Sequence, residues 1–264
     1  MSIIRTLQDA AIVTKRNMTK IKRVPDLLVF STISPIMFVL LFAYVFGSAI
    51  DVPGVSYREF LIAGIFVQTV IFGATYTGTS LAEDQQKGIV DRFRTLPMAR
   101  SAVLIGRTVA DVGTNVLTLV VMSLTGLLVG WRIRSSVGEA LAGFALLLLF
   151  SYAMSWMMAL AGLMVRAPEI MNNASFIIIF PLTFIANTFV PTDGFPTVLR
   201  VFADWNPISA VTLATRQLFG NTSPEFPPPD VWPLQNPVLY SLLTIAGLLI
   251  VFVPLSVRRY QRTV

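Results

Sequence analysis

Six long apolar runs, separated by short polar breaks, constrain this chain more than any other feature of its sequence. A helix needs about 20 apolar residues to cross the hydrocarbon core of a bilayer, and each run is near or above that length. The runs are continuous rather than alternating, which argues against a β-barrel. We therefore predict an all-α membrane protein that forms one domain over residues 1–264. Its six transmembrane helices are expected at about 27–49, 60–82, 102–129, 140–165, 172–190 and 238–255.

The composition agrees with a membrane protein and excludes several kinds of chemistry. Hydrophobic residues make up 55% of the chain and charged residues only 13%, whereas soluble domains average about 25% charged residues. The chain has no cysteine and no histidine, so it has no disulfide, no Cys/His metal site and no histidine general base. We predict no catalytic residue, no metal site and no cofactor in this chain.

The basic residues predict an orientation. The net charge is +6, but the bases flank the apolar runs instead of clustering on one soluble face, so we expect no nucleic-acid partner. With six spans and both termini on one side, that side holds 15 of the 20 lysines and arginines. Cytoplasmic loops carry such an excess of bases. The pattern predicts a multi-pass protein with both termini in the cytoplasm.

The first segment, 1–24, is basic and amphipathic. Ile3, Leu7 and Ala10 recur at helical spacing, and lysines and arginines fill much of the rest. This pattern predicts a helix that lies on the cytoplasmic leaflet. The alternative is the basic start of a signal peptide. A basic lead of more than about 20 residues is long for a signal peptide, which argues against that alternative.

The stretch 83–100, between the second and third runs, holds much of the charge of the chain. Gly88 can end one helix and Pro97 the next. The short helix between them has an apolar face that must be buried, either on another protein or against the membrane. That face consists of Ile89, Val90, Phe93 and Leu96.

A polar stripe follows in the third run. Arg107, Asp111, Asn115 and Thr118 recur at i, i+4, i+8 and i+11, so they share one helix face and the first two can form an ion pair. Charged residues in membrane helices usually face the interior of the bundle. The stripe is either a gate near the cytoplasmic end or a structural ion pair with a snorkelling arginine.

Two further helix faces mix aromatic and polar side chains. Such faces would suit an amphipathic hydrophobic cargo, although hydroxyl residues are also routine where membrane helices pack. The predicted pathway residues are Gln68, Phe72, Thr75, Tyr76 and Thr79 in the second run and Phe176, Phe180, Thr183, Phe184 and Asn187 in the fifth.

The segment 191–237 is apolar but broken by prolines. Its two apolar arms around Asn206-Pro207 are each too short to cross a bilayer. We predict an extracellular re-entrant hairpin whose backbone is buried in protein. A pair of interfacial helices is the alternative.

These motifs together resemble the permeases of type-2 ATP-binding-cassette (ABC) exporters over nearly the whole chain. The segment 189–196, with Asn206-Pro207, is similar to the daunorubicin-resistance subfamily. Where many members have Gly-Thr-Leu-Glu, this chain has Gly-Ile-Val-Asp at 88–91, which keeps an acidic residue in shorter form. The residues that match the signature loop are Glu83, Asp84, Lys87, Gly88, Asp91, Leu96, Pro97 and Arg100, followed by Gly106-Arg107.

The resemblance implies partners and roles. The protein would lie in a bacterial cell membrane, pair with an ABC ATPase subunit that binds ATP and Mg, and form a dimer with a second permease. The second and fifth spans would line the route, and the hairpin would close its outer end. The stretch 83–100 would be the coupling helix, with Glu83, Asp84, Lys87, Gly88, Asp91, Phe93, Arg94, Leu96, Pro97 and Arg100 at the ATPase contact.

One absence points the same way. The sequence has no GxxxxGK[ST] phosphate-binding loop, so ATP energy would have to come from another subunit. We expect the membrane subunit of an ATP-driven exporter for a hydrophobic or amphipathic drug or lipid. The alternatives are a glycan-lipid exporter permease, an intramembrane enzyme and a proton-driven transporter.

Overall fold

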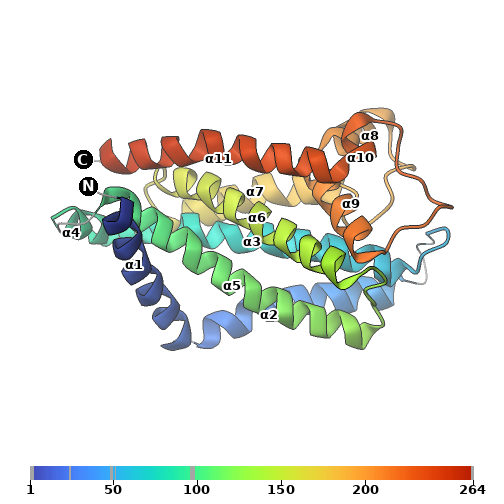
Figure 1. Cartoon of the computed structure of the whole chain (residues 1–264), viewed down its shortest axis with the longest axis horizontal. Coiled ribbons are helices and arrows are strands. Elements are labelled where there is room, and N and C mark those ends of the chain that lie inside the picture. The colour runs from blue at the N-terminus through green and yellow to red at the C-terminus, as the bar shows by residue number, and fades with distance from the viewer. Residues whose placement is uncertain (1–2, 24, 48–49, 51, 96–98, 263–264) are drawn as a thin grey trace.

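The structure, a computed structural model, describes residues 3–23, 25–47, 50, 52–95 and 99–262. Helices α3, α5, α6, α7 and α11 extend roughly along the long axis of the molecule, whereas α1 crosses that axis at a steep angle (Figure 1). We call the end that holds α4 and both chain termini the inner end, and the end that holds α8, α9 and α10 the outer end. The helices are α1 (Ile3–Arg23), α2 (Pro25–Leu41), a π-helical turn η1 (Phe42–Phe46), α3 (Tyr57–Gln86), α4 (Ile89–Thr95), α5 (Arg100–Val129), α6 (Val137–Gly162), α7 (Pro168–Ile185), α8 (Thr197–Trp205), α9 (Pro207–Phe219), α10 (Trp232–Gln235) and α11 (Pro237–Arg262).

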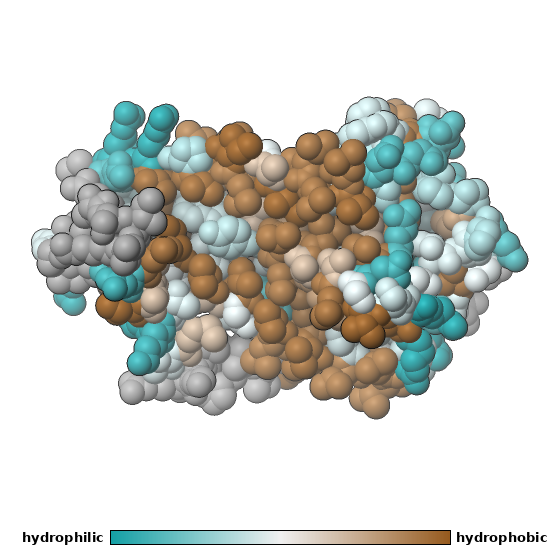
Figure 2. Space-filling model, in the orientation of Figure 1, coloured by the Kyte–Doolittle hydropathy of each residue, from teal (hydrophilic) through white to brown (hydrophobic). Residues whose placement is uncertain are grey.

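Five helices of the described chain are long and apolar enough to cross a membrane. They are α3, α5 from Ser101 onward, α6, α7 and α11, and they correspond to the second to sixth predicted runs. Figure 2 shows an apolar band across the middle of the face in view, with hydrophilic residues toward both ends. The first predicted run, 27–49, contains α2 and η1. The apolar helix identified there, Ile33–Phe46, is shorter than a span. A span over this first run, which would bring the total to six, therefore remains a prediction.

Helix α3 is the central element of the bundle. Its residues from 60 to 71 are all buried, because α5, α6, α7 and α9 pack around it. Small residues allow the closest of these contacts. A β-carbon added to Gly162 of α6 would lie 2.6 Å from the Cα atom of Gly78 in α3. The two helices therefore touch backbone to backbone at this crossing, as membrane helices do where glycines meet.

Helix α1 is amphipathic as predicted, and one of its faces is packed on α5. Ala10 and Val13 are buried there, the Thr14 hydroxyl donates to the carbonyl of Gly106 (3.1 Å), and the Asp9 carboxylate accepts the backbone N–H of Ala99 (3.1 Å). Other apolar side chains of α1, such as that of Leu7, are exposed. Contact between this exposed side and the membrane surface remains a prediction.

The two arms of the predicted hairpin differ in burial. Residues 208–216 of α9 are all buried against α3, α6 and α11. In α8, by contrast, residues 197–202 are exposed. A strap formed by residues 130–136 holds the end of α9, because the backbone N–H of Arg134 donates to the carbonyl of Phe219 (2.9 Å). The arms are therefore one buried and one surface helix, and re-entry of the pair into the membrane remains a prediction.

Asp204 on α8 makes the stability of the outer end depend on pH. Its side chain is 6% exposed, and its Oδ1 atom has no hydrogen-bond partner among the described residues. Burial raises the pKa of Asp204 above its ordinary 3.8, Arg200 opposes this shift and Asp193 adds to it. The folded chain therefore binds a proton at the Asp204 carboxylate more tightly than the unfolded chain does. Protonation of Asp204 thus stabilises the fold, and this stabilisation is lost as the pH rises through the pKa of Asp204 in the folded chain.

Asp204→Asn should therefore raise the melting temperature at neutral pH. It should also reduce the stabilisation that the wild type gains on mild acidification. Thermal unfolding of the purified protein at several pH values measures both effects, with Asp230→Asn, at another exposed position of the outer end, as the control. Equal pH profiles for wild type and Asp204→Asn would contradict this assignment.

Candidate functional site

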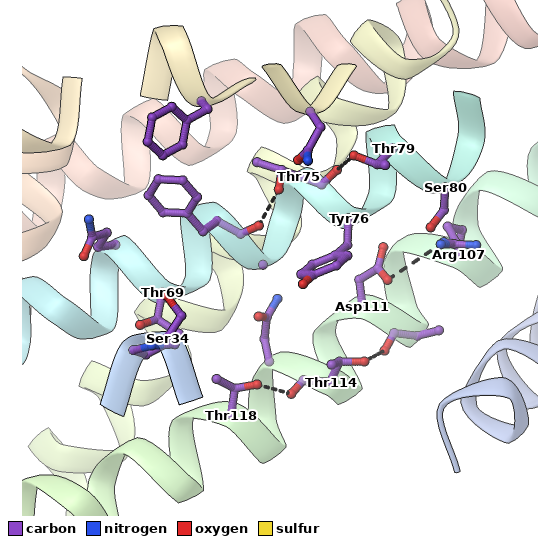
Figure 3. A pocket seen from close by; sticks show the side chains of 18 of the residues that line it. Ser34, Thr69, Thr75, Tyr76, Thr79, Ser80, Arg107, Asp111, Thr114 and Thr118 are labelled. Atoms are coloured by element: carbon purple, nitrogen blue, oxygen red, sulfur yellow. Dashed lines mark hydrogen bonds and ion pairs between the residues drawn. The ribbon is translucent and has the colours of Figure 1, made fainter. Parts of the chain in front are cut away.

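A cavity of about 510 Å³ lies between α1, α2, α3, α5 and α7 (Figure 3). Its wall mixes aromatic rings with hydroxyl and amide groups, and the only charged residues among those that line it are Arg107 and Asp111. Tyr76 and Phe176 are more than half exposed, so the cavity opens at the surface of the described chain. A cavity of this size and chemistry can hold a small amphipathic molecule.

The cavity brings together most of the predicted pathway residues. Seven of the ten line it, namely Gln68, Phe72, Thr75, Tyr76, Thr79, Phe176 and Phe180.

The other three pathway residues lie outside the cavity lining. The hydroxyl of Thr183 is buried and donates within its own helix to the carbonyls of Ile179 and Phe180. Phe184 stacks on the ring of Phe180. Asn187 lines a second, smaller pocket of about 50 Å³ at the outer end.

All four residues of the predicted stripe in α5, including Thr118, also line the cavity. Arg107 Nε and Asp111 Oδ1 are 3.9 Å apart, and each side chain is 13% exposed. The other carboxylate oxygen of Asp111 accepts a hydrogen bond from Thr77 in α3, whereas Arg107 Nε has no hydrogen-bond partner among the described residues. Asp111 is thus held by two helices, and Arg107 is paired only loosely.

Asn115 has a different environment. Its amide nitrogen donates to Ser151 Oγ in α6 (2.6 Å), and Gly73 of α3 leaves the space that the amide fills. A β-carbon at Gly73 would lie 3.1 Å from Asn115 Cγ. Asn115 therefore ties α5 to α6 beside the cavity, which is a structural contact as well as a lining one.

Several lining residues were not predicted. Asn17 is buried and follows Ala10 and Val13 on the face of α1 that packs on α5, so a polar residue in an apolar stripe was its signal. Ser34-Pro35 interrupts the first apolar run in a similar way. The residues that line the cavity without having been predicted are Asn17, Ser34, Pro35, Phe38, Thr69, Gly73, Ser80, Ala110, Thr114 and Asn172.

The stretch 83–100 forms the turn at the inner end that its glycine predicts. Gly88 has a φ of +64°, a left-handed conformation that glycine adopts without strain, and it separates α3 from α4. Lys87 forms an ion pair with Glu83 one turn back, and the hydrogen bond to Glu83 raises the pKa of Lys87. Of the other predicted contact residues, Leu96 and Pro97 lie outside the described residues, as do the side chains of Asp91, Arg94 and Arg100.

Two residues of the apolar face of α4, Val90 and Phe93, pack against other helices of the same chain. Val90 is buried with Leu81, Trp156 and Tyr260 of α3, α6 and α11, and Phe93 packs against the same cluster. Contact of this stretch with another protein or with the membrane remains a prediction. The surface left for a partner is polar, with Lys87, Arg92 and Thr95 exposed there.

Helix α1 contacts both α4 and the cavity. The guanidinium carbon of Arg16 lies 4.7 Å from the centre of the Phe93 ring, within the range of a cation–π contact. The next residue, Asn17, is 7% exposed and lines the cavity. One helix thus spans the distance between the turn at the inner end and the cavity wall.

Comparisons with known proteins agree with this architecture. Residues 8–219 match the family model described as "ABC-2 type transporter". The chain is 34% identical over 246 residues to the "Daunorubicin resistance ABC transporter permease protein DrrB1" of Streptomyces coeruleorubidus, which covers 93% of this chain and 83% of that protein. It is 23% identical over 246 residues to the "Probable doxorubicin resistance ABC transporter permease protein DrrC" of Mycobacterium tuberculosis. That alignment covers 92% of this chain and 85% of the relative. A family match over most of its length, joined to a bundle of apolar helices, shows that this chain belongs to the ABC-2 type transporter family.

Proposed function

We propose that this chain is the permease subunit of an ATP-driven exporter that moves a hydrophobic or amphipathic drug or lipid out of the cell. The observation that carries the proposal is the cavity, where aromatic, hydroxyl and amide groups from α3 and α7 meet the ion pair of α5. Membership of the ABC-2 family and the drug-resistance names of two relatives support it. The sequence has no phosphate-binding loop, so a separate ABC ATPase would bind ATP and Mg.

The contacts of α1 suggest how a partner could act on the cavity. An ATPase that moves the polar side of α4 would displace Phe93, which is in contact with Arg16 of α1. Helix α1 is hydrogen-bonded to α5 at Gly106 and places Asn17 in the cavity wall. A displacement of α1 would therefore reach Arg107 and Asp111. The loosely paired Arg107 could then exchange partners as the cavity opens.

Three further features belong to the same proposal. The first apolar run, helical from residue 25 to residue 46, would complete six spans and place both termini in the cytoplasm. Exposed apolar side chains of α2, η1 and α7, such as Met37, Tyr44 and Ile177, would be covered by a second permease copy or by lipid. At the outer end, α8 and α9 would close the route.

The alternatives fit the cavity less well. A glycan-lipid exporter would share the architecture and differ only in its cargo. An intramembrane enzyme needs a catalytic set, but the one carboxylate that lines the cavity, Asp111, is engaged by Thr77 and Arg107. A proton-driven transporter would require that carboxylate to exchange protons with water on both sides in turn.

The contact between α4 and an ATPase can be tested by reversing one exposed charge. We expect Arg92→Glu to reduce co-purification of the ATPase subunit with the tagged permease at least about tenfold, because an interfacial charge reversal costs several kcal/mol. ATP hydrolysis in the purified fraction should fall in parallel. Arg92 is exposed, so the permease itself should fold normally.

The matched control is Arg200→Glu, the same reversal at an exposed position of α8 at the outer end. It should leave both the recovered ATPase subunit and its activity unchanged. Normal recovery of an active ATPase with Arg92→Glu would rule out docking on this side of α4.

A further inference from the structure

Six phenylalanine rings form a continuous stack that starts in the cavity wall and leads to the outer end. Three rings, Phe176, Phe180 and Phe184, follow each other along α7 with centroid separations of 5.0 and 4.1 Å. Phe189, beyond the end of α7, is the next ring, 4.6 Å from Phe184. We call this stack, completed by two rings of η1, the phenylalanine ladder.

The upper part of the ladder crosses from one helix to another. The ring of Phe42 lies 4.8 Å from that of Phe189, and Phe46 lies 5.0 Å from Phe42. Both belong to the π-helical turn η1. Single π-turns in helices occur frequently at functional sites, and here the turn presents both of its phenylalanines to the same stack.

The ladder connects two places that the cavity alone does not. Its first two rings, Phe176 and Phe180, line the cavity. Its far rings lie near the start of α3, where the Tyr57 hydroxyl donates to the carbonyl of Phe189 (3.0 Å). The stack therefore runs from the cavity toward the outer end along α7 and η1.

Much of the ladder is accessible from the side. Phe176 is 55% exposed and Phe46 39% exposed, while Phe42, Phe180 and Phe184 are half-buried and only Phe189 is fully buried. Phenylalanine rings present large apolar surfaces with few rotatable bonds, and they attract other aromatic rings in stacked or edge-to-face arrangements. A flat ring system could exchange one such contact for the next without losing all of them at once.

We propose that the phenylalanine ladder is a second binding surface for the cargo, selective for flat aromatic ring systems, which it passes from the cavity toward the outer end. The inference rests on the proposed export function, and it adds a substrate chemistry and an exit path. Phe184 and Phe42 would be its specificity-determining residues, because each lies between two other rings of the ladder.

The test compares two alcohols of similar size, one aromatic and one aliphatic. The purified permease in lipid nanodiscs is dialysed against 1-pyrenemethanol or cyclododecanol, and protein-free nanodiscs correct for partition into lipid. We expect Phe184→Leu and Phe42→Leu each to weaken binding of 1-pyrenemethanol about fivefold. Binding of cyclododecanol should change less than twofold, since leucine keeps an apolar side chain in place.

Two controls separate this result from a packing defect. Phe150→Leu removes a buried ring outside the ladder and should leave the preference for the aromatic alcohol unchanged. Phe184→Tyr keeps a ring and should retain wild-type binding of 1-pyrenemethanol. The proposal would be overturned if Phe184→Leu and Phe42→Leu weakened binding of both alcohols equally, or weakened neither. It would also be overturned if these variants acted only by dissociating a permease dimer.

The assay uses the permease without its ATPase, so it is independent of the docking experiment. A permease that recovers an active ATPase but shows no ring-dependent binding would overturn the ladder and leave the export function standing. Ring-dependent binding in a permease that recovers no ATPase would overturn the coupling by ATP instead.

Discussion

Replacing Gly162 by valine is expected to prevent the bundle from assembling. A β-carbon at this position would lie 2.6 Å from the Cα atom of Gly78, and backbone cannot yield as the end of a side chain can. The axes of α3 and α6 would have to separate along the most extensive helix contact in the molecule. Overpacking alone costs about 1–3 kcal/mol, and displacement of the central helix should raise the cost above that range.

The measurement is the yield of monodisperse protein after detergent extraction, together with its melting temperature. Gly247→Val is the matched control, because Gly247 also lies in a long apolar helix, α11, but a β-carbon there would meet no atom within 4 Å. That variant should behave like the wild type. A Gly162→Val protein with unchanged yield and melting temperature would show that α3 and α6 are not in backbone contact.

Removing Arg216 should cost about 1–3 kcal/mol of stability for each buried carbonyl that loses its donor. The residue is 2% exposed and lies on α9. Its Nε atom donates to the carbonyl of Phe60 (2.8 Å), and its Nη2 atom donates to those of Asn187 (2.7 Å) and Thr188 (3.3 Å). The last two carbonyls belong to the irregular segment after α7, which has no helical partners to offer them.

Substitutions of different chemistry should give a graded result. Arg216→Ala leaves the carbonyls without their donor and opens a cavity. Arg216→Lys keeps the charge but cannot fork across three acceptors, so it should be intermediate. Gln217→Ala changes the exposed neighbour on the same helix and should have little effect. Thermal or denaturant unfolding measures all three, and equal stability of Arg216→Ala and wild type would show that α9 is held in another way.

Loss of Arg216 should also affect the outer end specifically. Arg216 joins α9 to the start of α3 and to the segment that follows α7. Besides apolar packing and the strap at 130–136, α9 is held by Ser209 Oγ, which accepts the backbone N–H of Asn187 (3.2 Å). Loss of Arg216 should therefore loosen the closure of the proposed route before it loosens the bundle. Hydrogen exchange of α9 in the milder Arg216→Lys variant would report that local loosening.

The spans could be predicted from the sequence because length and apolarity are properties of each helix by itself. Five of the predicted runs form helices long and apolar enough to cross a membrane. The turn at Gly88 was also local, since a left-handed residue after a helix favours glycine. The faces of the second and fifth runs followed from the 3.6-residue period of a helix, which is why seven of the ten pathway residues line the cavity.

What each face meets could not be predicted in the same way, because it depends on how separate helices pack. The period of α4 correctly predicted an apolar face, but only the fold-back of the turn places Val90 against α3, α6 and α11. The two arms around Asn206 have similar composition, yet α9 is buried and α8 is exposed. Phe42 and Phe189 are far apart in the chain and stack only in three dimensions.

The sequence by itself therefore determined the class of the protein, the five helices that are long and apolar enough to cross a membrane, and most of the residues on each polar face. The tertiary structure decided that the pathway face, the ion pair of α5 and Asn17 of α1 share one cavity. It also decided that phenylalanines of two separate helices form one ladder. The physical reason is that periodicity sets direction within a helix, whereas neighbours across space depend on close approaches such as that of Gly78 and Gly162.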